Sequence, residues 1–178
     1  MSLLAETVSV LREERIDHAL IGAGAMALHG VSRATVDVDL LTVDTRTLQV
    51  ALWSGFEVRD VSVRVLKGDS DDPLAGSVRL VAGGSDIVDV VVGRYKWQAE
   101  ILASSPVLSV GEIEIPVAHP AGLVLLKLHA GGPKDAWDIT SLAETHEQWA
   151  TIVDDVDRLV DRLPLESQRL WKRLRAEI

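Results

Sequence analysis

The spacing of hydrophobic residues divides the first third of the chain into short helices and strands. Residues 3–15 place Leu4, Val8 and Leu11 at helical spacing, which predicts an amphipathic helix. The elements that follow are expected to be a strand, a helix, a strand and a helix, over residues 18–21, 23–29, 36–43 and 45–53. Gly30 and Gly55 are expected to end the two later helices.

The middle of the chain is rich in predicted strands. Residues 61–66 and 78–81 are two of them, joined by the acidic loop GDSDDPLAG. Residues 87–92 are almost entirely apolar, which is typical of a strand in the centre of a sheet. A helix at 95–103 and a strand at 112–117 follow, and the chain is helical from His119 onward, with a break near Pro164.

This order predicts an α/β (α+β) fold: a mixed β-sheet flanked by helices, with a helical C-terminal cap. The chain carries no internal repeat, low-complexity run or Pro/Gly/Ser linker. We therefore expect a single domain over 1–178, with a core at about 15–145 and C-terminal helices at about 146–178.

Composition narrows the possible functions. The chain is 47% hydrophobic and 25% charged, as soluble globular proteins are. It has no cysteine, which excludes disulfides, cysteine-based zinc sites and thiol nucleophiles. No membrane-spanning run or signal peptide is recognisable, so we expect a cytoplasmic protein. A formal net charge of −9 argues against a broad nucleic-acid-binding face.

Two acidic residues stand out within the strand predicted at 36–43. Asp37 and Asp39 are two residues apart, so their carboxylates point to the same side of the strand and repel each other. A divalent cation bound between the two carboxylates would remove this repulsion. The alternative explanation for the pair is that this side of the strand faces water and that both acids are only solvated. Asp89 lies in IVDVVV, where an acid needs a partner or a metal. If the two strands are neighbours, the three carboxylates suit two-metal phosphoryl transfer.

A glycine motif precedes this strand. Residues 22–27, GAGAMA, match the GxGxxA form of the dinucleotide fingerprint, and Asp44 follows at about the expected distance. An NAD-binding Rossmann-type protein is therefore an alternative. The early end of the helix at Gly30 and the two acids inside the next strand argue against it. The same strand-to-helix turn would also present backbone N–H groups to a triphosphate.

The stretch IGAGAMALHGVSRATVDVDLLTVD resembles the polymerase-β-like nucleotidyltransferase superfamily, whose members have a strand, a small-residue turn, a helix and a strand with Asp-x-Asp. More narrowly, it resembles relatives of the AbiEii-type nucleotidyltransferase toxins. The residues that carry this similarity are His29, Gly30, Arg33, Thr35, Asp37, Asp39 and Leu40. The similarity continues through DPLAGSVRL, VDVVVGRYKWQ, IPVAHPAGLVLLKLHAGG and PKDAWDI, and covers about residues 15–145.

The resemblance implies a nucleotidyltransferase fold and roles for the acidic residues. Asp37 and Asp39 would hold Mg²⁺ or Mn²⁺, and Asp89 would be the third metal-binding acid and the candidate general base. Gly22 and Ala23 would border the triphosphate of the NTP. Ala23 departs from the pattern, because many active members have Gly or Ser there.

The resemblance also implies nucleotide contacts farther along the chain. Arg33, Lys127 and Lys134 would contribute to the nucleotide site, and Asp135 and Asp138 belong to the same helical motif. The residues themselves leave other roles open. Lys127 lies in the very apolar LVLLKLHA and is equally explained as a snorkelling structural lysine. Lys134 and Asp135 are explained as the first turn of a helix.

These observations favour a metal-dependent enzyme that transfers NMP from an NTP to a hydroxyl of RNA, protein or a small molecule. The AbiEii-type resemblance suggests a place within a toxin–antitoxin system. The alternative is a catalytically weak or inactive nucleotidyltransferase-fold binding partner, antitoxin-like, that acts by contact with a cognate protein.

Overall fold

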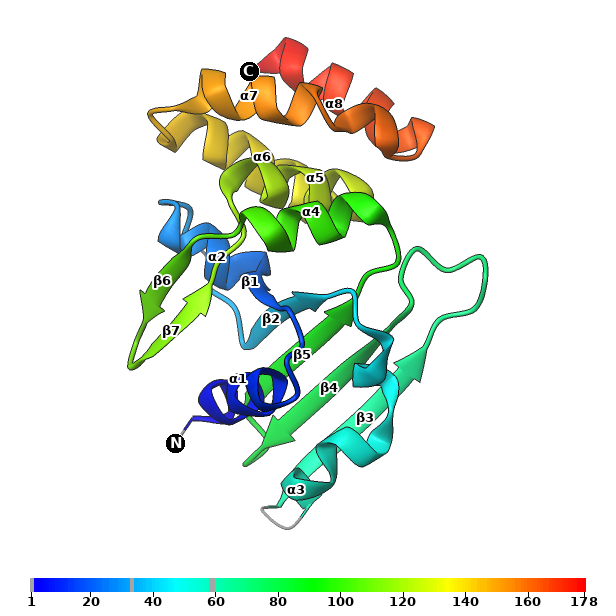
Figure 1. Cartoon of the computed structure of the whole chain (residues 1–178). Helices are drawn as coiled ribbons and strands as arrows, with labels where there is room; N and C mark the ends of the chain where they lie inside the picture. Colours follow the sequence, from blue (N-terminus) through cyan, green and yellow to red (C-terminus); the bar gives the residue numbers. More distant parts are fainter. Residues whose placement is uncertain (1, 33, 58–59) are drawn as a thin grey trace.

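A mixed β-sheet lies at the centre of the fold. The computed structural model describes residues 2–32, 34–57 and 60–178. Within these residues five strands pair in the order β1-β2-β5-β4-β3 (Figure 1). They are β1 (Ala19–Ile21), β2 (Asp37–Thr42), β3 (Val61–Lys67), β4 (Gly76–Ala82) and β5 (Asp86–Val92). Strands β2 and β5 are parallel, and the other neighbours are antiparallel.

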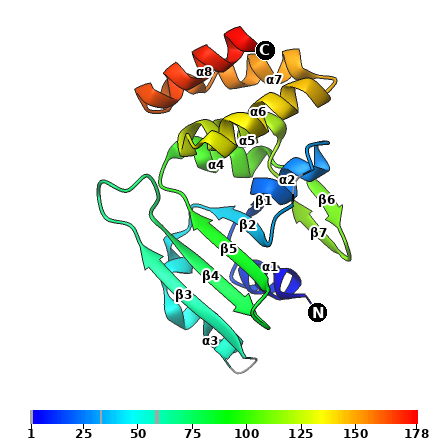
Figure 2. The ribbon, with the colours of Figure 1, turned by 180° about the vertical axis from the view of Figure 1, so that it is seen from behind.

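Short helices cover one face of β3, β4 and β5. They are α1 (Leu3–Glu13), the 3₁₀ turns η1 (Thr45–Leu48) and η2 (Val50–Trp53), and α3 (Ser54–Glu57). Leu11 and Trp53 from this layer join Leu80, Val88 and Val90 of the sheet in the hydrophobic core. Seen from behind in Figure 2, the other face of these three strands has no helix in front of it. The alternation of the strands therefore leaves partly or fully exposed residues on that face, among them Arg64, Arg79 and Asp89.

A second layer of helices stands at one end of the sheet (Figure 1). It comprises α2 (Gly22–Leu28), α4 (Lys96–Ser104), α5 (Pro120–Ala130), α6 (Pro133–Thr145), α7 (Trp149–Asp157), η3 (Val160–Arg162) and α8 (Leu165–Glu177). Helix α5 packs against α6, α7 and α8, and most of its residues are buried, as expected of a helix that is apolar all round. Gly131 ends it in the left-handed conformation at φ 69°.

The predicted fold class is confirmed: helices flank a mixed sheet and form a C-terminal cap. The expected strand at 112–117 is β7 (Ile113–Pro116), and it forms a hairpin with β6 (Val107–Val110), which the pattern did not predict. Among the described helices, none is long and apolar enough to cross a membrane.

The predicted helix at 45–53 is wrong. The segment forms the turns η1 and η2, and Gly55 lies inside α3 instead of ending a helix. The indole N–H of Trp53 donates to the carbonyl of Thr47 at 2.8 Å, so the chain folds around the buried tryptophan. The β-branched residues Thr45, Thr47 and Val50 also disfavour a continuous α-helix.

Three histidines, His18, His29 and His129, are partly or fully buried. The ring of His18 contacts the carbonyl of Ile16 at 2.8 Å, and the ring of His29 contacts the carbonyl of Ala118 at 3.1 Å. Burial is the main cause that lowers the pKa of His18, His29 and His129 below the ordinary value.

Candidate active site

The three acidic residues predicted to converge lie on one face of the sheet. Asp39 on β2 is the Cα partner of Asp89 on β5 in the parallel register, and Asp37 precedes Asp39 by two residues. Paired residues of neighbouring strands point to the same side, as do residues two apart on one strand. Because β2 and β5 are parallel neighbours, side chains separated by 50 residues of sequence share a surface. We call this surface the carboxylate face.

Arg79 of β4 joins the carboxylate face. It is the Cα partner of Asp89, and its Nη2 lies 3.0 Å from Asp89 Oδ2 and 3.3 Å from Asp37 Oδ2. The Arg79, Asp37 and Asp89 side chains are 47%, 38% and 19% exposed. Thr35 Oγ1 also donates to Asp37 Oδ1 at 2.7 Å. In this structure a guanidinium therefore supplies the positive charge between two of the three carboxylates.

The electrostatics of Asp89 reflect these neighbours. Burial raises the pKa of Asp89 and the charge of Asp37 raises it further, while Arg79 opposes both. A carboxylate with a raised pKa is better suited to accept a proton than a fully solvated aspartate.

Gly22 is required by the position of Asp39. Its φ is +62°, and a Cβ at Gly22 would lie 2.0 Å from Asp39 Oδ2. The absence of a side chain thus lets the start of α2 pack directly on the carboxylate. The next residue, Ala23, is 2% exposed, so its methyl group belongs to the protein interior.

The donor atoms of the carboxylate face fit a hard divalent cation, because carboxylate oxygens are the preferred ligands of Mg²⁺ and Mn²⁺. In the present arrangement, no group of three or more His, Asp or Glu side chains among the described residues is gathered so that it could hold a metal ion. Arg79 lies between Asp37 and Asp89 instead. Its side chain is half exposed, and a cation at these two carboxylates would have to displace it.

A cavity of about 420 Å³ opens beside Asp39, between the sheet and the helical layer. Gly22, Asp39 and Val91 line it on the sheet side, and Lys127 and Asp135 line it on the helix side. Because it separates the two layers, we call it the inter-layer cavity. It places a mostly apolar, partly open volume next to the carboxylate face, as ligand sites often do.

Lys127 is held by a buried ion-pair network. It is 7% exposed, lies 3.2 Å from Asp135 Oδ1 and also pairs with Asp138, which is fully buried. Asp135 additionally accepts the backbone N–H of Gly132 at 3.0 Å, so it caps α6. Lys127 and Asp135 thus have structural roles and also line the inter-layer cavity.

Two other residues were predicted as nucleotide contacts. Lys134 is exposed in the first turn of α6 and is not part of the cavity lining. Arg33 lies outside the described residues.

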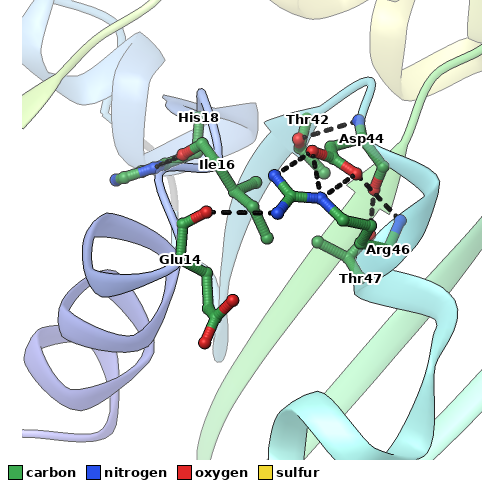
Figure 3. A network of polar contacts seen from close by, with 7 residues as sticks. All are labelled: Glu14, Ile16, His18, Thr42, Asp44, Arg46 and Thr47. Atoms are coloured by element: carbon green, nitrogen blue, oxygen red, sulfur yellow. Dashed lines mark hydrogen bonds and ion pairs between the residues drawn. The ribbon is translucent and has the colours of Figure 1, made fainter.

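Asp44, the acid that the dinucleotide fingerprint would require, forms an ion pair with a neighbouring arginine. Figure 3 shows Asp44 paired with Arg46, with Asp44 Oδ2 lying 2.6 Å from Arg46 Nη2. The hydrogen bond from Arg46 is the main cause that lowers the pKa of Asp44. Arg46 Nη1 also donates to the carbonyl of Glu14 at 3.3 Å, which ties η1 to the end of α1. The mixed sheet, with β2 and β5 as its parallel pair among the described strands, excludes the dinucleotide-binding fold.

Sequence reasoning missed two residues of the site region. Arg79 is one of several outward-facing residues on a strand, and its role follows only from the register with Asp89. Gln98 lines the inter-layer cavity, and a glutamine in the first turn of a predicted helix is a recognised capping signal that could have drawn attention to it.

Comparison with known proteins supports the fold. No family model matches the chain, and no curated protein matches it. Among solved structures, the solution structure of the antibiotic-resistance factor ANT(2″)-Ia aligns with a TM-score of 0.59 and 11% identity, over 90% of both chains. The crystal structure of ANT(2″)-Ia in complex with adenylyl-2″-tobramycin aligns with a TM-score of 0.58 and 13% identity, over 90% of this chain and 96% of that chain. The chain therefore has the nucleotidyltransferase fold.

Proposed function

We propose that this chain is a metal-dependent nucleotidyltransferase that transfers NMP from an NTP to a hydroxyl group. The observation that carries the proposal is the parallel register that sets Asp39 beside Asp89 on the carboxylate face, with Asp37 next to them. The shared fold supports it, and the complex of ANT(2″)-Ia with adenylyl-2″-tobramycin illustrates a nucleotide joined to an acceptor.

In the proposed reaction the acceptor oxygen bonds to the α-phosphorus, the bond from the α-phosphorus to the bridging oxygen breaks, and pyrophosphate leaves. Asp37 and Asp39 would hold Mg²⁺ or Mn²⁺, with Asp89 as third ligand. A bound divalent cation would supply charge neutralisation at the phosphates and favour departure of pyrophosphate. Asp89 would take the hydroxyl proton as general base.

The nucleotide would approach from the side of the inter-layer cavity, which reaches Gly22 and Asp39. Gly22 and the backbone at Ala23 would border the triphosphate. Lys127 would keep its pairs with Asp135 and Asp138 and donate its third ammonium hydrogen to a phosphate oxygen. The predicted roles of Arg33 and Lys134 in nucleotide binding stay predictions.

The acceptor would approach from the open side of the carboxylate face, where Asp89 and Arg79 lie. A small molecule is the first acceptor to test, because the structure of ANT(2″)-Ia contains an adenylylated small molecule. RNA is less favoured, because the formal net charge of −9 repels a phosphate backbone. A protein acceptor or a cognate toxin or antitoxin partner, as the AbiEii-type resemblance suggests, would be found by co-purification.

One observation favours a second candidate, a nucleotidyltransferase-fold binding partner with little or no catalysis. Arg79 bridges Asp37 and Asp89 with a permanent positive charge, which competes with any cation for the same oxygens. Ala23, which stands where many active members have Gly or Ser, also favours this second candidate. If Arg79 were never displaced, the fold would persist without metal-dependent transfer.

A transfer assay distinguishes the two candidates. The purified chain is incubated with each NTP labelled at the α-phosphate, with Mg²⁺ and a cell extract as the source of acceptors. We expect a labelled product from the wild-type chain and none from Asp39→Asn or Asp89→Asn. Asp86→Asn is the matched control, because Asp86 lies on the same strand and accepts from the backbone N–H of Leu3. Absence of labelled product from the wild-type chain with every NTP would favour the binding partner.

A further inference from the structure

Two arginines extend the carboxylate face beyond its three acids. Asp89 on β5 is the Cα partner of Arg79 on β4, and Arg79 is the Cα partner of Arg64 on β3. The three side chains therefore stand in one row on the same side of the sheet. Figure 2 shows no helix in front of β3, β4 and β5 on this side, and both arginines are exposed.

The two arginines repel each other. Side chains directly opposite on antiparallel strands have Cβ atoms about 4.5–5.5 Å apart, and like charges there are destabilising. Arg79 is compensated by its carboxylate partners at 3.0 and 3.3 Å. Arg64 forms no ion pair or hydrogen bond among the residues that the structure describes. Its neighbours on this face are uncharged: Ser62, Leu66, Ser77 and Val81.

The proposed cation would increase this imbalance. A cation at Asp37 and Asp89 would have to displace the guanidinium of Arg79, which leaves two arginines without a carboxylate on neighbouring strands. An anion bound between them would relieve the repulsion. Phosphate and carboxylate groups are suited to this, because their oxygens accept two parallel hydrogen bonds from the planar guanidinium.

The nucleotide is not the source of this anion. The inter-layer cavity, which the proposed function assigns to the nucleotide, borders Gly22 and Asp39 but neither Arg64 nor Arg79. The arginines lie instead on the open side of the carboxylate face, from which the acceptor would approach. The anion would therefore be part of the acceptor.

We infer that the acceptor is a small molecule with a phosphate or carboxylate group and that Arg64 and Arg79 bind this group. The inference rests on the proposed function, which places the acceptor hydroxyl at Asp89. Neighbouring strands lie about 4.8 Å apart, so the two arginines begin about 5 and 10 Å from Asp89. A hydroxyl and an anionic group at this separation fit a molecule the size of a sugar phosphate. A cationic acceptor would be repelled.

The charge of the acceptor can be tested before the acceptor is identified. The small-molecule fraction of a cell extract is passed through an anion-exchange resin at neutral pH, and bound compounds are eluted with a volatile salt that is then removed. Transfer from NTP labelled at the α-phosphate is measured with the flow-through, with the eluate and with the macromolecular fraction. We expect labelled product from the eluate.

The other outcomes separate the inference from the proposed function. If labelled product forms only from the flow-through or only from the macromolecular fraction, the inference is wrong and the proposed function stands. If no fraction yields labelled product with any NTP, the proposed function fails and the inference fails with it.

Variants of Arg64 test its role in acceptor specificity. Arg64→Met should raise the KM for the eluted acceptor at least about tenfold, as expected for loss of a charge-assisted hydrogen bond, and leave kcat and the KM for NTP within about twofold. Arg64→Lys retains the charge and should restore part of the loss. Lys67→Met is the matched control, because Lys67 is exposed on the same strand and its odd spacing from Arg64 places it on the opposite side.

An unchanged KM in Arg64→Met would overturn the inference. It would mean that Arg64 only protects β3, a strand at the edge of the sheet, from pairing with another chain.

Sulfate tests the arginine pair without catalysis. The Tm is measured with sodium sulfate and with NaCl at equal ionic strength, in the presence of Mg²⁺. Sulfate stabilises folded proteins in general, so only the difference between variants is informative. The rise should be smaller in Arg64→Met than in the wild-type chain and in Lys67→Met. An equal rise in all three would show that the two arginines do not form an anion site.

Discussion

Replacing Arg79 by methionine removes the guanidinium between Asp37 and Asp89 and keeps the length of the side chain. Arg79 makes ion pairs of 3.0 and 3.3 Å, but all three side chains are partly exposed and solvent screens them. Each such pair contributes about 0.2–1 kcal/mol. Arg79→Met is therefore expected to lower the free energy of unfolding by about 1 kcal/mol in the metal-free protein, which corresponds to about 2–4 °C in Tm. The loss should shrink as ionic strength rises.

The same change should have the opposite effect on metal binding. In the wild-type chain a cation must displace the guanidinium, whereas in the variant the carboxylates repel each other until a cation arrives. If Mg²⁺ binding no longer has to break the ion pairs of Arg79, and these contribute about 1 kcal/mol, the affinity for Mg²⁺ rises about fivefold. The assay is Tm against Mg²⁺ concentration at constant ionic strength.

Arg64→Met is the matched control, because Arg64 on β3 is the Cα partner of Arg79 and is equally a surface arginine of the sheet. It should change neither the metal-free Tm nor the Mg²⁺ response by a comparable amount. An unchanged or weaker Mg²⁺ affinity in Arg79→Met would refute the reasoning, because it would mean that Arg79 does not compete with the cation.

Further outcomes follow from the fold and the site. Gly22→Ala should lower the free energy of unfolding by more than about 1–2 kcal/mol, because alanine is strained at φ +62° and its Cβ would lie 2.0 Å from Asp39 Oδ2. Gly24→Ala is the control: a Cβ there has its nearest contact at 3.5 Å, so the Tm should be unchanged or higher. The pKa values of His18, His29 and His129 are lowered by burial, so below about pH 6.5 the unfolded chain binds more protons than the folded chain. The free energy of unfolding, measured by urea denaturation, should therefore fall between pH 7 and pH 5, and a flat profile would contradict this. NTPs with Mg²⁺ should bind and NAD should not, and tight metal-independent NAD binding by calorimetry would count against the assignment.

Much of the fold could be predicted because hydrophobic periodicity is a local property. The apolar run at 87–92 indicated a central strand, and β5 indeed lies between β2 and β4. The acid at position 89 suggested that this strand neighbours the one with Asp37 and Asp39, and the two strands pair. An acid in an apolar strand is informative because burying it alone is unfavourable, so its presence constrains what lies next to it.

The site was less predictable because its remaining features depend on tertiary register. Arg79 meets Asp37, 42 residues away in sequence, only through the pairing of β4 with β5 and of β5 with β2. Gln98 stands out only once the cavity and the two backbone donors at the start of α4 are known. The helix predicted at 45–53 was wrong for a similar reason, because the burial of Trp53 and its hydrogen bond to Thr47 depend on the packing of the whole chain.

Whether the carboxylate face binds a divalent cation is tested most directly by the thermal stability of the chain with its two β2 acids intact or neutralised. This measurement does not depend on the identity of the acceptor. Millimolar MgCl₂ or MnCl₂ should raise the Tm of the wild-type chain, because a ligand that binds the native state stabilises it. The double change Asp37→Asn with Asp39→Asn should abolish the rise, and NaCl of equal ionic strength should not reproduce it. An equal rise in the double variant would show that the cation binds elsewhere and would contradict the proposed site.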